Sequence, residues 1–359
     1  MRSGCTLCES LDTNKKTCPL NPHAININKK KHSNSKKYGG SKVKKEINKK
    51  EINIIEKELL RKKLYEEILD WMKIEIKDKL QIKEIQHMLL RYIFNKIITR
   101  TKEDDPIFVM TPSIIADNQM RKDCNYFKLS LDVEKFINIL KTKIINASIK
   151  ITSNKIPNDK KVLYDQMKKH MYYQGASYYD INNMVDKYKT KMNYLIALNI
   201  RYNYLHLTTH GLANLYNRKY NKKEGTEGFA SVFNHYFDKY CTAFHDLEKP
   251  FGSIGSFFEI NHWTTEKVFV NPPFDEALII KMVEKIYNKA KNKIEFIITL
   301  PYWRDFKIIN ELIYSHWTIN HTEYKKGKLP FYDYMTKQMI YPSDIIEITM
   351  SNKVMSNKK

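Results

Sequence analysis

The part of the sequence after Gly225 alternates short apolar runs with stretches of helical periodicity, and this alternation constrains the fold most strongly. The clearest run is Ile-Glu-Phe-Ile-Ile-Thr-Leu at 294–300, which is typical of a buried strand. Strands that alternate with helices predict βαβ units and a mainly parallel sheet, so the expected fold class is α/β. We expect strands at 228–232, 266–270, 294–300 and 345–350, and helices at 234–244, 275–290 and 304–315.

The preceding part of the sequence is helical in character. Apolar residues recur near helical spacing from Glu51 to Thr99, and no Gly or Pro occurs between Gly40 and Pro106. Beyond this stretch we expect a short strand at 106–110 and helices at 132–151 and 180–205. The chain is therefore predicted to comprise a tail at 1–50, a helical domain at 51–160 and an α/β domain at 161–352.

The tail is strongly basic and contains cysteines. Residues 1–50 hold 13 Lys or Arg against 3 Asp or Glu. Cys5, Cys8, Cys18 and His23 have the ligand types and spacing of a small structural zinc site, with His32 as an alternative fourth ligand. The competing interpretation is an unstructured tail with incidental cysteines.

The whole chain carries a formal net charge of +22, which favours a polyanionic partner, with nucleic acid ahead of an anionic membrane surface. The alternative is compositional drift, because Lys, Asn, Ile and Tyr are all abundant. No apolar run reaches the roughly 18 residues of a membrane span, and the start lacks a signal peptide, so we expect no membrane contact and an intracellular location.

The motif Asn271-Pro272-Pro273-Phe274 follows a predicted strand and precedes a predicted helix. In a parallel sheet, ligands bind at the carboxyl ends of strands. The Asn271 side-chain oxygen and the Pro272 carbonyl could each accept one hydrogen of an exocyclic amine and aim its lone pair, while the prolines fix the backbone. Phe274 offers a face for stacking a base. The motif is typical of amino-methyltransferases; the competing interpretation is a proline-rich turn.

Further elements occur in a fixed order around this motif. They are Gly228-Phe229-Ala230-Ser231-Val232-Phe233-Asn234, then Tyr240 to Asp246, then Phe251-Gly252-Ser253, and after the motif Phe296 to Arg304. In this order the series resembles the phosphorylated-CTD-interacting-factor family of cap-specific adenosine N6-methyltransferases, most clearly over 190–350. The resemblance implies a class I (Rossmann-like) methyltransferase domain, S-adenosylmethionine as cofactor and capped RNA as partner.

The resemblance also implies roles for individual residues. Asn271, Pro272, Pro273 and Phe274 match the catalytic motif. Ala230, Ser231, Asn234, Phe251, Gly252, Ser253 and Asn271 are assigned to the cofactor, with Val232 in place of the usual proline. Trp303 matches a tryptophan beyond the strand that follows the motif.

The cationic 7-methylguanine base of a cap requires aromatic faces and an acid. Phe274, Glu276, Tyr302, Trp303 and Arg304 are the candidates for substrate binding, although residues such as Tyr302, Trp303 and Glu276 are more often packed aromatics or solvated helix acids. Arg201, Arg218 and Arg304 could hold phosphates or lie on the surface. His206 and His210 lie four residues apart, but without a third ligand we interpret them as structural.

Two features depart from the family. We find no WW domain like that of the animal members, so binding to phosphorylated polymerase tails is not expected. Cys18-Pro19-Leu20-Asn21-Pro22 resembles short tags in proteins of large DNA viruses, which suggests a giant-virus homologue. The expected location is then the host cytoplasm, in a virus factory, and otherwise the nucleus.

The resulting hypothesis is N6-methylation of the cap-adjacent (2'-O-methyl)adenosine of 7-methylguanosine-capped mRNA. The alternatives are N6-adenine methylation of DNA or internal RNA, and an inactive relic that binds RNA ends.

Overall fold

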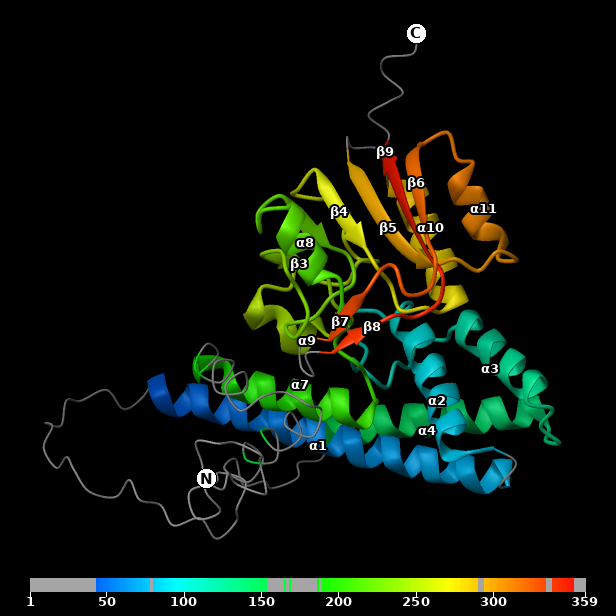
Figure 1. The fold of residues 1–359 in the computed structure, drawn as a ribbon. Coiled ribbons are helices and arrows are strands. Elements are labelled where there is room, and N and C mark those ends of the chain that lie inside the picture. Colours follow the sequence, from blue (N-terminus) through cyan, green and yellow to red (C-terminus); the bar gives the residue numbers. More distant parts are fainter. Residues whose placement is uncertain are drawn as a thin grey trace, which may run out of the picture.

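The computed structural model describes residues 43–77, 80–153, 165, 168, 186, 189–289, 294–333 and 338–351 (Figure 1). Its longer helices are α1 (Val43–Ile76), α2 (Ile82–Ile97), α3 (Ile114–Tyr126), α4 (Val133–Ser153), α7 (Met192–Tyr204) and α10 (Glu276–Lys289). Shorter helices are the 3₁₀ turns Lys189–Lys191 and Lys249–Phe251, α8 (Ala213–Lys219), α9 (His245–Glu248) and α11 (Lys307–Ile313). Across these residues, no helix combines the length and apolarity that crossing a membrane requires.

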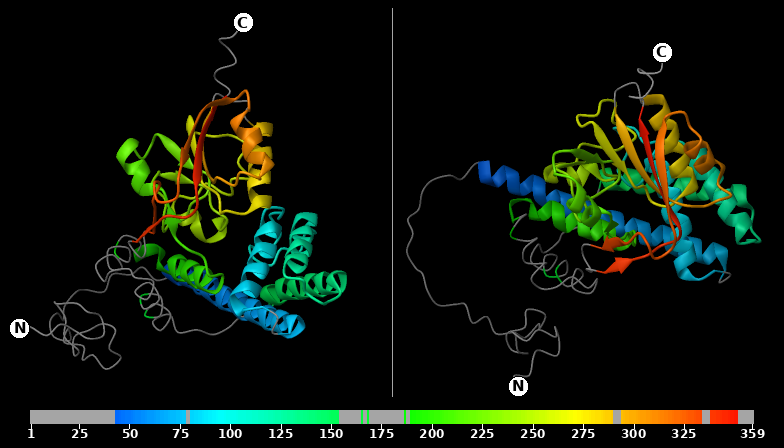
Figure 2. Two further views of the ribbon diagram at one scale, coloured as in Figure 1. Left: turned by 45° about the vertical axis from the view of Figure 1, so that its right-hand side comes forward. Right: turned by 45° about the horizontal axis from the view of Figure 1, so that its top comes forward.

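Helices α1, α2, α3, α4 and α7 pack around a common apolar core. The predicted helix at 51–99 is two helices, because α1 ends at Ile76 and Lys77 adopts a φ of 50°. Helix α2 restarts where the Glu84 carboxylate accepts the Gln81 N–H at 2.8 Å. Ile85, Met88, Leu89, Tyr92 and Ile93 then follow helical spacing and are all buried. Figures 1 and 2 show α1, α4 and α7 as a layer below the sheet.

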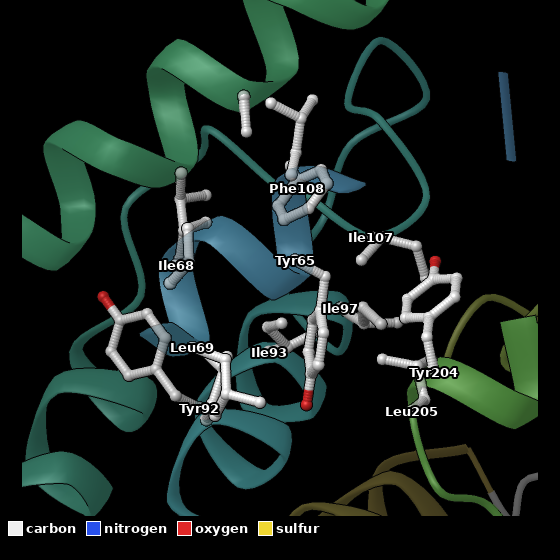
Figure 3. Close-up of a cluster of buried hydrophobic side chains, with 14 of the residues drawn as sticks. Tyr65, Ile68, Leu69, Tyr92, Ile93, Ile97, Ile107, Phe108, Tyr204 and Leu205 are labelled. Carbon is white, nitrogen blue, oxygen red and sulfur yellow. The ribbon is translucent and has the colours of Figure 1, made fainter. Parts of the chain in front are cut away.

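The strand predicted at 106–110 is wrong, since these residues form a buried loop. The Asp105 carboxylate accepts the N–H groups of Ile107 and Phe108 at 3.0 Å each. Asp104 accepts the N–H groups of Met110 and Thr111 in the same way. Side chains thus satisfy the backbone donors that a strand partner would otherwise satisfy. Figure 3 shows Ile107 and Phe108 in the helical core with Tyr65 and Tyr204.

The main sheet has six strands in the order β3-β2-β4-β5-β9-β6. Strands β3, β2, β4 and β5 are parallel, whereas β9 is antiparallel to both of its neighbours, β5 and β6. Their bounds are β2 Gly225–Glu227, β3 Lys239–Tyr240, β4 Lys267–Val270, β5 Glu295–Pro301, β6 Thr318–Tyr324 and β9 Ile345–Ser351. The α/β fold class with a mainly parallel sheet is confirmed.

Both faces of this sheet are covered by helices. Val268 and Val270 of β4 pack with α10 and α11, while Phe269, which points to the opposite face, packs with α8. A second, three-stranded sheet pairs β1 (His210–Gly211), β7 (Phe331–Asp333) and β8 (Met339–Ile340) in antiparallel register. Figure 1 shows β7 and β8 between the main sheet and α7.

Most of the strands and helices predicted after 265 are confirmed. Strands at 266–270, 294–300 and 345–350 correspond to β4, β5 and β9, and the helix at 275–290 corresponds to α10. The helix at 304–315 is shorter than predicted, and β6 was not predicted. Among the earlier helices, 132–151 is confirmed as α4, and the end of the predicted 180–205 helix is confirmed by α7.

The region after β2 was predicted incorrectly. The strand lies at Gly225–Glu227 instead of 228–232, and 234–244 is an extended loop that contains β3 instead of a helix. The Glu227 carboxylate accepts the N–H groups of Tyr236 and Phe237 in this loop. Burial raises the pKa of this carboxyl to about 7.

The predicted tail and the domain boundaries are largely outside the described residues. Helix α1 begins at Val43, seven residues before the predicted end of the tail at residue 50. The boundary near 160 falls between 154 and 164, where the structure gives no description. The division into 1–50, 51–160 and 161–352 therefore stays a prediction.

A buried ion-pair network joins the helices to the segment after β3. Arg201 of α7, whose side chain is fully buried, donates to Glu58 of α1 at 2.6 and 2.9 Å and to Asp246 of α9 at 2.8 and 2.9 Å. Glu58 also accepts hydrogen bonds from Arg61 and Tyr204. The Arg201 guanidinium lies 5.0 Å from the centre of the Phe244 ring. The network thus connects α1 and α7 to α9.

Candidate active site

A pocket of about 420 Å³ lies at the carboxyl ends of β2 and β4. Its walls come from three parts of the fold: the loops after β2, β3 and β4, helices α2 and α7, and the small sheet. The lining is mainly apolar and aromatic, with a few polar side chains, and the volume is in the range of small-molecule sites. The aromatic lining residues are Phe94, Tyr202, Phe229, Phe244, Phe274 and Phe331, and the polar ones are Thr208, His210, Asn234, Thr242 and Asn271.

The predicted catalytic motif lies in this pocket. Strand β4 ends at Val270, and Asn271, Pro272, Pro273 and Phe274 follow it as lining residues. The Asn271 Oδ1 atom is buried and accepts no hydrogen bond within the described residues. The Pro273 carbonyl accepts the Asp275 N–H at 2.8 Å, whereas no backbone N–H of the described residues donates to Pro272. Two acceptors are therefore available to a ligand at the end of β4.

The loop after β2 supplies the opposite wall. Ala230 and Asn234, which the sequence assigns to the cofactor, line the pocket, and their assignment to a cofactor stays a prediction. Ser231 is buried beneath them, and its N–H and Oγ donate to Asn234 Oδ1 at 2.8 and 3.1 Å. The Asn234 amide nitrogen in turn donates to the His210 carbonyl at 2.9 Å. Ser231 thus supports Asn234 instead of lining the pocket itself.

Glu248 of α9 joins the two loops that follow β2 and β3. Its carboxylate accepts the Val232 N–H at 2.6 Å and the Thr242 hydroxyl at 2.7 Å, and the side chain is fully buried. Burial raises the pKa of Glu248 to about 7, despite these hydrogen bonds. Thr242 lines the pocket, so its hydrogen bond to Glu248 holds one pocket wall in position.

The element Phe251-Gly252-Ser253, which the sequence assigns to the cofactor, does not line this pocket. Phe251 packs into the helical core, and Ser253 forms a parallel bridge with Tyr240 at the end of β3. Gly252 has a φ of 108°, a conformation that L side chains rarely adopt. The structure therefore gives these residues a place in the turn behind the pocket, and their role toward a cofactor stays a prediction.

Of the candidate substrate-binding residues, Phe274 lines the pocket, whereas Glu276, Tyr302, Trp303 and Arg304 do not. Phe274 lines the pocket, and the Trp303 ring beyond β5 meets it edge to face with 6.4 Å between ring centres. Arg304 places its guanidinium 5.4 Å from the centre of the Tyr302 ring. Glu276 is exposed at the start of α10 and does not line the pocket. An aromatic surface therefore extends from Phe274 in the pocket to Trp303. Tyr302 and Arg304 are the neighbours of Trp303 in the sequence.

Sequence reasoning missed several lining residues. Phe94 and Tyr202 come from the helical part, and His210 and Phe331 come from the small sheet. Burial raises the pKa of Tyr202 far above neutrality. No local motif marks these positions, because only the packing of distant segments brings them to the ends of β2 and β4.

The proposed zinc ligands Cys5, Cys8, Cys18 and His23 lie outside the described residues, as does His32. In the ranges that the structure describes, no group of three or more His, Cys, Asp or Glu side chains could hold a metal ion. His206 follows α7 and His210 belongs to β1, so the two histidines do not share a helix. Their interpretation as structural histidines stays a prediction.

Residues 168–334 match the sequence model of the family described as "Phosphorylated CTD interacting factor 1 WW domain". A mouse protein and a human protein, both named mRNA (2'-O-methyladenosine-N(6)-)-methyltransferase, are 38% and 37% identical to this chain over 82 residues. Each alignment covers 22% of this chain and 12% of the relative. The predicted lack of a WW domain stays a prediction, as does the viral origin.

Proposed function

We propose, on the premise that residues 168–334 belong to the phosphorylated-CTD-interacting-factor family, that this chain methylates the N6 amine of adenosine in RNA. The proposed substrate is the cap-adjacent (2'-O-methyl)adenosine of capped mRNA. The names of the two relatives specify 2'-O-methyladenosine in mRNA, which supports this choice of nucleotide. The proposed methyl donor is S-adenosylmethionine. The mainly parallel sheet with helices on both faces supports a class I (Rossmann-like) methyltransferase domain.

One observation carries the proposal: the unpartnered Oδ1 atom of Asn271, buried at the carboxyl end of β4. Asn271 Oδ1 is one of several buried polar atoms without a hydrogen-bond partner among the described residues, and it is the one that belongs to a pocket-lining residue. A buried amide oxygen without a donor costs stability, so a ligand that supplies a donor is favoured there. An adenine N6 amine supplies the missing donor. The Pro272 carbonyl, one residue farther along, is suited to accept the second amine hydrogen.

The residues of the pocket fit the cofactor as well as the amine. S-adenosylmethionine presents a methyl group on a cationic sulfonium, and the aromatic faces of the lining attract cations. Asn234 and Thr242 provide polar atoms on the β2 and β3 side of the pocket. Asn271 and Phe274 lie on the β4 side, where the adenine would bind.

The chain contributes mainly by positioning and by electrostatic preorganisation. The N6 lone pair is delocalised into the adenine ring and is a weak nucleophile. Hydrogen bonds from both N6 hydrogens to Asn271 and Pro272 favour a more tetrahedral nitrogen and aim its lone pair. Phe274 can stack on the base, and the apolar walls exclude water from the reacting atoms.

The test is methyl transfer from radiolabelled S-adenosylmethionine by the full chain. The RNA substrates begin with adenosine or 2'-O-methyladenosine and carry either a 7-methylguanosine cap or a 5' triphosphate, and a DNA oligonucleotide of the same sequence is included. Transfer to capped RNA alone is the expected result. Equal transfer to capped and uncapped RNA would overturn the cap requirement, and transfer to DNA alone would overturn the RNA assignment.

A further inference from the structure

Strand β8 and the residues after it present different side chains to the pocket and to solvent. Ile340 and Pro342 line the pocket. Met339 and Tyr341 alternate with them and are 53% and 42% exposed. Such alternation follows from an extended backbone, in which successive side chains point to opposite sides. The Tyr341 hydroxyl lies 3.8 Å from the Met339 sulfur, so these two side chains form one exposed rim beside the pocket.

The rim is continuous with the place proposed for the adenine. Phe331 of β7 pairs with Ile340 of β8 and meets the Phe274 ring edge to face, with 6.0 Å between ring centres. Phe274 is the ring on which the adenine is proposed to stack. Consecutive Cα atoms are about 3.8 Å apart, and a stacked strand advances about 3.4 Å per nucleotide. Since Met339 and Tyr341 each adjoin a lining residue, the rim lies within about one nucleotide step of the pocket lining.

The charged side chains that the structure describes near the rim are mainly basic. Lys325, Lys326 and Lys328, in the turn between β6 and β7, are exposed. The acid that follows the rim in the sequence is Asp344, whose carboxylate accepts Lys325 Nζ at 3.3 Å and the Lys326 N–H at 2.9 Å. The Lys326 N–H lowers the pKa of this carboxyl, and the Lys325 and Arg304 charges lower it further. The rim therefore suits a partner that combines a neutral apolar face with negative charge.

This charge pattern distinguishes between the two neighbours of the target nucleotide. On its 5' side lies the cap, whose 7-methylguanine base is a cation and requires an acid beside its aromatic partner. Lysines disfavour such a base, and the charge of Asp344 is already compensated. On the 3' side lies an ordinary nucleotide with a neutral base and an anionic phosphate. Neutral bases stack on aromatic side chains whatever their identity, and lysines attract the phosphate.

We propose that the rim binds the base of the nucleotide that follows the methylated adenosine. Tyr341 stacks on this base, Met339 packs against its edge, and Lys326 and Lys328 attract the adjoining phosphates. The inference rests on the proposed function, because it takes the target adenosine to lie in the pocket. Its consequence is a preference for RNA that extends beyond the first nucleotide, without a preference among bases, since every base offers a π face.

The test measures the affinity of the full chain for three RNA probes. They are the cap joined to the target adenosine alone, a capped pentanucleotide, and the same pentanucleotide without its second base. Wild type should bind the intact pentanucleotide about 5-fold more tightly than the probe without the second base, which is the low end for stacking of one base on an aromatic side chain. Tyr341→Ala should lose this 5-fold advantage and should bind the other two probes like wild type.

Two further variants serve as controls. Tyr341→Phe keeps the aromatic face and should bind every probe like wild type. Tyr126→Ala should do the same, because Tyr126 is 80% exposed at the end of α3, which Figures 1 and 2 show away from β8. A fluorescent base, 2-aminopurine, in the second position reports stacking directly. Its fluorescence should fall when the RNA binds wild type and should not fall with Tyr341→Ala.

Three results would overturn the role of the rim. An equal loss of affinity of Tyr341→Ala for the cap-adenosine probe and the pentanucleotide would assign Tyr341 to the cap. Additive losses from Tyr341→Ala and from removal of the second base would show that the two do not contact each other. Unchanged affinity of Tyr341→Ala for every probe would leave the rim to a protein partner.

The same measurements separate this inference from the proposed function, because binding needs no turnover. A chain that binds the probes in the expected pattern but transfers no methyl group overturns the proposed function alone. A chain that methylates capped RNA, and whose affinity ignores the second base, overturns the role of the rim alone.

Discussion

Two buried polar sites in this molecule are built in opposite ways. In the network between α1, α7 and α9, Arg201 donates hydrogen bonds to Glu58 and Asp246. Glu58 also accepts hydrogen bonds from Arg61 and Tyr204. In the pocket, the buried Oδ1 of Asn271 has no donor among the described residues. The first site is complete without a ligand, whereas the second is complete only when a ligand binds. Changes in the network should therefore affect stability, and changes in the pocket should affect activity.

The largest expected effect is on stability, at the network. Arg201→Met removes the cation that compensates two carboxylates, and breaking a buried pair in this way costs about 3–5 kcal/mol. This is a large fraction of the roughly 5–15 kcal/mol that holds a domain folded. Urea unfolding monitored by fluorescence measures the loss. The exposed Arg218→Met is the control and should change the free energy of unfolding by less than about 0.5 kcal/mol. Similar losses in both variants would contradict the network's role.

The next effect is on activity, at the pocket. Asn271→Ala should lower methyl transfer about 100-fold to 1000-fold, which is the usual consequence of losing one positioning hydrogen bond in a transition state. The free energy of unfolding should change by less than about 1 kcal/mol, because the Oδ1 atom has no partner in the fold. Radiolabel transfer and urea unfolding give the two numbers. An Asn271→Ala variant that unfolds readily would mean that Asn271, like Arg201, serves the fold.

Glu248 shares features with both sites. Its buried carboxylate has hydrogen-bond donors within the fold, as in the network, but it supports residues of the pocket. Its folded-state pKa of about 7 exceeds the ordinary carboxyl value, so the folded state keeps a proton that the unfolded state has lost. Its contribution to stability is present below about pH 4.5 and is lost as the pH rises through about 7. Between pH 5 and 8, wild type should lose about 2 kcal/mol more than Glu248→Gln. The control is Glu276→Gln, on the exposed start of α10, and a wild-type slope in Glu248→Gln would exclude Glu248 as its source.

The smallest effect is expected on the aromatic surface next to the pocket. Arg304 is exposed and stacks on Tyr302, so Arg304→Ala should raise KM for RNA only about 3-fold and leave kcat unchanged. The difference should shrink as salt increases, because exposed charges are screened. Steady-state kinetics at two salt concentrations measures it. A fall in kcat would show that Arg304 acts on the reaction itself.

The sequence predicted those parts of the fold in which burial and local pattern agree. Strands β4 and β5 are continuous apolar runs, and the Asn-Pro-Pro-Phe motif therefore lies at a strand end as expected. In contrast, Phe233, Phe237, Tyr240, Cys241 and Phe244 follow helical spacing and are all buried, yet their segment is extended. The carboxylate of Glu227 captures two backbone donors there. Apolar residues at helical spacing therefore do not by themselves establish a helix, since an extended segment can bury the same residues.

The candidate site was predictable only on its β2 and β4 side. Asn271 and Asn234 belong to continuous motifs, so the sequence alone identifies them. Phe94, Tyr202 and His210 belong to elements that reach the pocket through tertiary packing, and their local sequences carry no signal. Phe251 and Ser253 are the reverse case. The sequence assigns them to the cofactor because they lie near the motifs, but they do not line the pocket.

The placement of β9 between β5 and β6 has a consequence for synthesis of the protein. Strand β6 has no partner in the main sheet until β9 is inserted, and β9 is the last strand of the part of the chain that the structure describes. His210 likewise gains its pairing only with β7, more than a hundred residues later, as the Thr209–Asp333 hydrogen bond illustrates. Loop closure over such separations is slow compared with local helix formation. On the ribosome, the helices before residue 205 can therefore form early, while the pocket is assembled only after the carboxyl-terminal strands have left the exit tunnel.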